Sequence, residues 1–190
     1  SPPCARNSPS MPSSARATSI YVDSGGTMYV GTENHGVFTS ATGTSWSSTW
    51  GPTWTTSPRA IMAITSSTAS GGTSFVATTS GLYRKVGAGS WSLVDGGSGY
   101  AINDVVVDPN CPQRVYAALG FVAAYSLHRG GIDMSDDNGS TWTNLTAGQT
   151  IHQAGIAGVH VDSTDSRYLY AAVYGQGAWV YDRGSTPTCP

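Results

Sequence analysis

The chain has 190 residues, enough for one domain with a hydrophobic core. Its 9 basic and 11 acidic side chains leave a net charge of −2, so no positive field gathers nucleic acid or anionic lipid. The longest apolar stretch, residues 115–124, is too short to span a membrane.

The composition predicts an all-β fold. Charged residues make up only 11% of the chain, and Glu33 is its one glutamate. Val, Ile, Tyr, Trp and Thr fill the apolar runs, and these residue types favour strands. A surface rich in Ser, Thr and Gly with few charges is typical of a secreted protein. A first residue other than methionine is typical of a processed one. We therefore expect an extracellular location, where the sequons at Asn138 and Asn144 would carry glycans only in a glycosylating host.

In chain order, a Pro/Ser-rich segment, residues 1–16, precedes four repeated units. The units lie at about 17–50, 59–95, 100–146 and 154–186, and a tail of residues 187–190 follows. Each has an alternating apolar stretch, a turn, a second stretch centred on an aromatic residue, and a glycine that opens a third stretch. The aromatic residues are Tyr29, Phe75, Tyr116 and Tyr170, and the glycines, which recur every 45 to 50 residues, are Gly36, Gly81, Gly131 and Gly177.

Four short antiparallel strands per unit at this period are typical of a β-propeller blade. A single blade would expose both of its faces, and neighbouring blades bury them. The sequence therefore predicts a small β-propeller of four four-stranded antiparallel blades.

The stretch SDDNGSTW, residues 135–142, lies between the third and fourth expected strands of the third unit. It resembles the Asp-box (BNR repeat) of sialidase-like propellers, also found in the sortilin ectodomain and in xyloglucan-degrading endoglucanases. The resemblance implies a hairpin on the outer face of the propeller, away from any active site. The matching residues are Ser135, Asp137, Gly139, Thr141 and Trp142.

The residue types of this stretch suit a structural turn. Asp137 can accept backbone N–H groups, and Gly139 permits a positive φ. A calcium loop is disfavoured, because the sixth position counted from Asp133 is Asn138 rather than glycine and no glutamate follows.

The fourth unit ends before its outermost strand would form. We expect residues 1–16 to complete that blade and close a four-bladed ring, because their prolines suit an edge strand. Two alternatives remain open: a neighbouring molecule fills the open edge, or the chain is a half-propeller that pairs with another copy.

The three cysteines lack metal-ligand spacing, so we expect no metal site. Cys4 and Cys189 lie near the chain ends, and we expect a disulfide between them that fastens the closure. Cys111 would then be free or bonded to another molecule.

Two stretches fall outside the repeat. The insertion at residues 121–129 is either a contact patch for assembly or a hairpin that packs on its own blade. Trp50 and Trp54 either stack on sugar rings or wedge the first blade against the second. The apolar residues of the insertion are Phe121, Val122, Tyr125 and Leu127.

Resemblance to sialidases implies an arginine cluster, a tyrosine nucleophile paired with glutamate, and an acidic aspartate. Glycoside hydrolysis in general needs two carboxylates that face one cleft. Candidates such as Asp23, Asp104 and Asp133 can be named, but Asp108 and Asp162 end matching strands, which indicates a structural role. We therefore predict no catalytic residue and no cofactor.

The preferred function is a secreted, non-catalytic scaffold that self-associates through its tails and open blade edge. The alternative is a glycan-binding or glycoside-hydrolase-like module, with carbohydrate as its partner.

Overall fold

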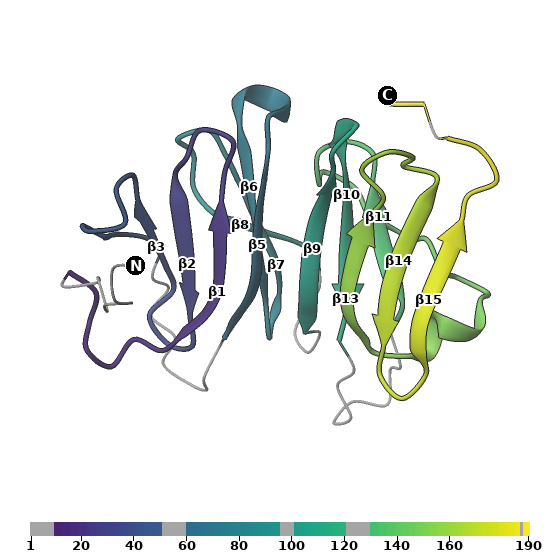
Figure 1. The fold of residues 1–190 in the computed structure, drawn as a ribbon, viewed down its shortest axis with the longest axis horizontal. Helices are drawn as coiled ribbons and strands as arrows, with labels where there is room; N and C mark the ends of the chain where they lie inside the picture. Colours follow the sequence, from purple (N-terminus) through teal and green to yellow (C-terminus); the bar gives the residue numbers. More distant parts are fainter. Residues whose placement is uncertain (1–9, 51–59, 96–100, 121–129, 187) are drawn as a thin grey trace, which may run out of the picture.

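The computed structural model describes residues 10–50, 60–95, 101–120, 130–186 and 188–190. The described strands form four antiparallel sheets (Figure 1). The first contains β1 (Ala17–Val22), β2 (Met28–Thr32), β3 (Val37–Ser40) and β4 (Ser47–Trp50). The second contains β5 (Ile61–Ser67), β6 (Thr73–Thr78), β7 (Gly81–Val86) and β8 (Ser92–Asp95).

The third sheet contains β9 (Ile102–Asp108), β10 (Cys111–Leu119), β11 (Ile132–Ser135) and β12 (Thr143–Asn144). The fourth contains β13 (Ile156–Val161), β14 (Tyr168–Val173) and β15 (Gly177–Asp182). Two 3-10 helices, η1 (Ala69–Gly71) and η2 (Thr150–Gln153), lie between strands.

Every sheet is a meander in which strands consecutive in the chain pair with each other. The prediction of an all-β fold built from small antiparallel blades is confirmed. The fourth sheet differs from the others because it has three strands within the described residues.

The sheets pack one after another through their first strands: β1 lies against β5, β5 against β9, and β9 against β13. Figure 1 shows the first and fourth sheets at opposite ends of the long axis, with the second and third between them. The described strands thus form an open arc, and the expected four-bladed closed ring is wrong. The side chains between neighbouring sheets set the angle between them, and the three junctions do not bring the last sheet back to the first.

Each sheet has a forward face, toward the next sheet in the chain, and a backward face, toward the preceding one. Cross-strand register assigns Phe75 and Tyr116 to forward faces and Val76 and Ala117 to backward faces. Three hydrophobic clusters fill the spaces between successive sheets, and all four of these residues are buried in them. Burying one such aromatic side chain stabilises the fold by roughly 2–3 kcal/mol.

The described part of the N-terminal segment, residues 10–16, contacts the first sheet. The Trp46 N–H donates to Ser10 Oγ at 2.6 Å, and Arg16 Nη1 lies 3.1 Å from Glu33 Oε2. This part therefore does not complete the last blade, which lies at the other end of the arc. Residues 1–9 are outside the described residues.

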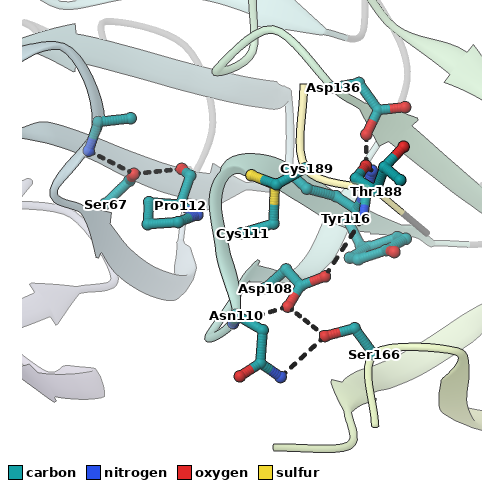
Figure 2. Close-up of a disulfide and its surroundings, with 12 residues drawn as sticks. Ser67, Asp108, Asn110, Cys111, Pro112, Tyr116, Asp136, Ser166, Thr188 and Cys189 are labelled. Atoms are coloured by element: carbon teal, nitrogen blue, oxygen red, sulfur yellow. Dashed lines mark hydrogen bonds and ion pairs between the residues drawn. A yellow bond between two sulfur atoms is a disulfide. The ribbon is translucent and has the colours of Figure 1, made fainter. Parts of the chain in front are cut away.

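The disulfide joins Cys111 to Cys189, with their Cα atoms 5.3 Å apart (Figure 2). The expected Cys4–Cys189 pair is therefore wrong, and Cys111 is not free. Nearness to the chain ends was a misleading guide: the described N-terminal residues contact the first sheet, whereas the C-terminal tail returns from β15 to the start of β10 in the third.

Candidate functional site: the axial groove and the turns around it

A groove of about 530 Å³ lies where the first strands of the four sheets end and the turns that follow them begin. We call it the axial groove, because the first strands lie side by side along it. All four first strands contribute to its wall, at the equivalent positions Tyr21, Thr65, Val106 and His160. The Tyr21 hydroxyl lies 3.0 Å from Ser66 Oγ, so the wall mixes hydroxyl groups and an imidazole with apolar surface. This combination suits a polar ligand with apolar patches, such as a sugar.

The carboxylates at the ends of the first strands are engaged by their own turns. Asp23 accepts the N–H groups of Gly25 and Thr27 at 2.9 and 2.8 Å. Asp108 accepts the N–H of Asn110 at 2.9 Å. Since the same bond recurs at equivalent turns, it serves the turn rather than a reaction.

The remaining two sheets repeat this arrangement. Ser67 Oγ accepts the N–H of Ala69 at 3.0 Å, and Asp162 accepts the N–H of Thr164 at 2.8 Å. The Thr164 hydroxyl and N–H and the Asp165 N–H lower the pKa of Asp162 to about 2. From the sequence, only Asp108 and Asp162 were matched. Aligning all four units would have shown that Asp23 and Ser67 occupy the same position in the turn after the first strand.

The Asp108 carboxylate also lies in a buried polar network between the third and fourth sheets. It accepts the Ser166 hydroxyl at 2.6 Å and forms an ion pair with Arg114, at 3.7 Å between Oδ2 and Nη1. Arg114 Nε reaches Asp136 at 2.5 Å, and its Nη2 donates to the Thr188 carbonyl at 2.8 Å. Figure 2 shows this network beside the disulfide. The arginine therefore fastens the C-terminal tail, a role that its place in a repeated turn did not reveal.

The two other candidate carboxylates are engaged as well. Asp104 accepts the N–H groups of Val159 and Val105 at 3.0 and 2.9 Å, and burial raises its pKa against the opposing effect of these bonds. Asp133 is buried and accepts the Asn144 side-chain amide at 2.9 Å. Each carboxylate thus has a partner within its own sheet or on the next one.

The turn at residues 135–142 is organised around Asp137. Its carboxylate accepts the N–H groups of Ser140 and Thr141 at 2.9 and 2.8 Å, and the hydroxyls of Ser135 and Thr141 at 2.8 and 2.7 Å. Burial opposes ionisation, but these bonds outweigh it and lower the pKa of Asp137 to about 2. The indole N–H of Trp142 closes the turn on the Gly139 carbonyl at 3.2 Å.

The same turn also binds the second sheet. The Asn138 side-chain amide donates to Thr73 Oγ1 at 2.7 Å, and Arg84 Nη1 donates to the Asn138 carbonyl at 2.9 Å. Gly139, at a φ of 77°, lies directly over the Phe75 ring. The turn is therefore a contact between blades as well as a hairpin, which the motif alone did not indicate.

Trp50 lies between the first and second sheets. Its ring centroid is 4.8 Å from that of Tyr83 and 5.3 Å from that of Trp91. This position matches the wedge interpretation. Trp54 lies outside the described residues, as do the expected assembly contacts Phe121, Val122, Tyr125 and Leu127.

Within the described ranges, no group of three or more His, Cys, Asp or Glu side chains is arranged to hold a metal ion. The helices in the same ranges are too short to cross a membrane.

Comparison with known proteins identifies the fold. The chain is similar to a xyloglucanase from Hypocrea jecorina (strain QM6a), with 33% identity over 113 residues, which are 52% of this chain and 14% of that protein. It resembles the structure of an ancestral GH74 enzyme with a TM-score of 0.72 and 18% identity, over 90% of this chain and 23% of the other. The chain has a β-propeller fold.

Other solved structures agree. The GH74 xyloglucanase from Xanthomonas campestris has a TM-score of 0.58 and 21% identity, over 86% of this chain and 27% of the other. YCF48 from Cyanidioschyzon merolae has a TM-score of 0.63 and 18% identity, over 93% and 54%. No family model matches the chain. The chain thus spans about a quarter or less of the xyloglucanase and GH74 proteins, and its arc is related to xyloglucanase-type propellers.

Proposed function

We propose that this chain is an extracellular, non-catalytic propeller segment that serves as a self-associating scaffold. One observation carries the non-catalytic part: the carboxylates at repeated positions are occupied in holding turns and blades together. Asp108, for example, is fully buried and bound to Ser166 and Arg114, so it is not available to protonate a leaving group. The disulfide supports the location, because disulfides persist in oxidising surroundings such as the extracellular space.

The test is to incubate the purified chain with xyloglucan and measure the reducing ends released, with sedimentation velocity run alongside over a range of protein concentrations. We expect no release above that of a heat-denatured sample, and a sedimenting mass that rises with concentration. Release of reducing ends that is lost in Asp104→Asn, with the fold intact, contradicts the non-catalytic part. A constant mass of one chain contradicts the scaffold.

A second function, binding of a β-glucan chain in the axial groove, is favoured by the similarity to a xyloglucanase. The groove offers the Tyr21 hydroxyl and the His160 imidazole beside apolar surface. Calorimetric titration with xyloglucan oligosaccharides tests it. Because one hydrogen bond contributes about 1 kcal/mol, Tyr21→Phe or His160→Ala should weaken binding roughly fivefold to tenfold. Tyr174→Phe, at an exposed tyrosine outside the groove, is the matched control.

A further inference from the structure

We propose that two copies of this chain close into one eight-bladed ring, in which the forward face of each fourth sheet packs on the backward face of the partner copy's first sheet. The inference deepens the proposed scaffold function, because it names the partner as a second copy and assigns the surfaces that meet.

The first observation is an uncovered forward face on the fourth sheet. Tyr170 occupies the position that Phe75 and Tyr116 occupy in the second and third sheets. Phe75 and Tyr116 are 0% exposed, because the next sheet covers them, and Tyr29, the equivalent residue of the first sheet, is half-buried, whereas Tyr170 is 39% exposed. Its neighbours in the same cross-strand row, His160 and Val180, are exposed as well.

The second observation is an exposed first strand on the backward face of the first sheet. Ile20 stands where the other sheets have Ile64, Val105 and Val159. Those three are 7%, 2% and 4% exposed, and Ile20 is 71% exposed. The open area is confined to β1 and includes Val22, while Val30 and Phe38, further across the same face, are buried. Within the chain, neighbouring sheets contact each other mainly through their first strands. The exposed surface over β1 is therefore the surface that a docking sheet would contact.

The turns of the chain show how an aromatic residue on a forward face is covered. Gly139, on the third sheet, lies over the ring of Phe75, and Arg183, on the fourth, donates to the Tyr116 hydroxyl at 2.8 Å. The first sheet has an equivalent turn, in which Gly43 has a φ of 75° and donates its N–H to Ser40 Oγ at 2.9 Å. Within the described chain this turn has no preceding aromatic residue to cover.

Polar contacts between first strands follow the same repeat. Thr18 Oγ1 donates to the Ile61 carbonyl, and Asn103 Nδ2 donates to the Ile156 carbonyl at 2.7 Å. The second sheet has Met62 at the corresponding position and still packs on the third, so this bond is not essential to a junction. The fourth sheet has Ala157 there, so its junction with a partner copy would lack this bond, as the junction between the second and third sheets does.

These features make a second copy the fitting occupant. The exposed surfaces continue three junctions that already exist within the chain, and each chain carries one surface of each kind. Two chains related by a two-fold axis satisfy both surfaces at once, and two-fold dimers are the most common closed assemblies. Eight blades lie within the range of four to eight seen in propellers. The exposed aliphatic side chains of these surfaces, Ile20, Val22 and Val180, make their exposure in an isolated chain unfavourable.

The experiment is light scattering after size exclusion, on the chain as it exists and over a range of concentrations. We expect a particle of twice the 19.7 kDa chain mass. Ile20→Arg and Tyr170→Arg each place a charge at a position that is buried in the junctions within the chain, and each should raise the dimer dissociation constant at least about 100-fold. Leu93→Arg is the matched control, because Leu93 is exposed on an outermost strand and should leave the dimer intact. Circular dichroism checks that each variant folds.

The outcomes separate the two proposals. A wild-type chain that stays monomeric overturns both the ring and the scaffold. Open polymers that grow with concentration overturn the ring and leave the scaffold standing. A dimer that survives both Ile20→Arg and Tyr170→Arg overturns the assignment of these faces.

Discussion

Replacing Gly139 with alanine tests whether the turn at residues 135–142 is a contact between blades. An added Cβ would lie 2.6 Å from Cε1 and 3.1 Å from Cζ of Phe75, which is fully buried and has no room to retreat. The left-handed backbone, at a φ of 77°, costs an alanine about 1–2 kcal/mol. Overpacking against the ring adds roughly 1–3 kcal/mol. We expect a total loss of roughly 2–5 kcal/mol in the free energy of unfolding.

The assay is thermal and urea unfolding of Gly139→Ala beside Gly148→Ala. Gly148 has a φ of 79° and no atom within 4 Å of an added Cβ, so its variant carries the backbone strain alone. At roughly 2–4 °C per kcal/mol for a chain of this size, Gly139→Ala should melt about 4–20 °C below the wild type and clearly below the control. Equal losses for the two variants would refute the packing of this turn on Phe75.

Three further perturbations test the disulfide that holds the C-terminal tail, the loss of stability at acidic pH, and the buried ion pair. Cys189→Ser removes a crosslink to Cys111 across 78 residues and should lower the free energy of unfolding by about 4 kcal/mol at most, measured by denaturation without reductant; peptide mapping that finds another pairing contradicts it. The folded pKa of Asp137, about 2, is lower than the ordinary 3.8, so its stabilisation is complete above about pH 4 and lost as the pH falls toward 2; Asp137→Asn should flatten the stability profile there, and an unchanged profile argues against the hydrogen bonds of the turn. Arg114→Met leaves Asp108 buried without its cation and should cost roughly 3–5 kcal/mol in urea unfolding, with partial recovery in the double variant Asp108→Asn/Arg114→Met.

Local features were predictable from the sequence because they depend on neighbours in the chain. The alternation of apolar residues set the strands, and Gly139 with Asp137 indicated a tight turn whose hydrogen bonds stay within a few residues. The contacts of Asn138 and Arg114 were not predictable. Their partners, Thr73 and Thr188, are 65 and 74 residues away, and no local pattern encodes such a distance.

The amino-acid sequence by itself determined the repeat, the β class and the small antiparallel blades, since strand propensity and turn chemistry act over a few residues. Only the tertiary structure decided how the blades are arranged. Whether four sheets close a ring depends on the angle at each junction, and that angle arises from side chains of two sheets packing together. The same packing decided that Cys189 meets Cys111. It also decided that Ile20 and Tyr170 stand exposed at the two ends of the arc, whereas Ile64 and Tyr116, at the equivalent positions of the inner sheets, are buried.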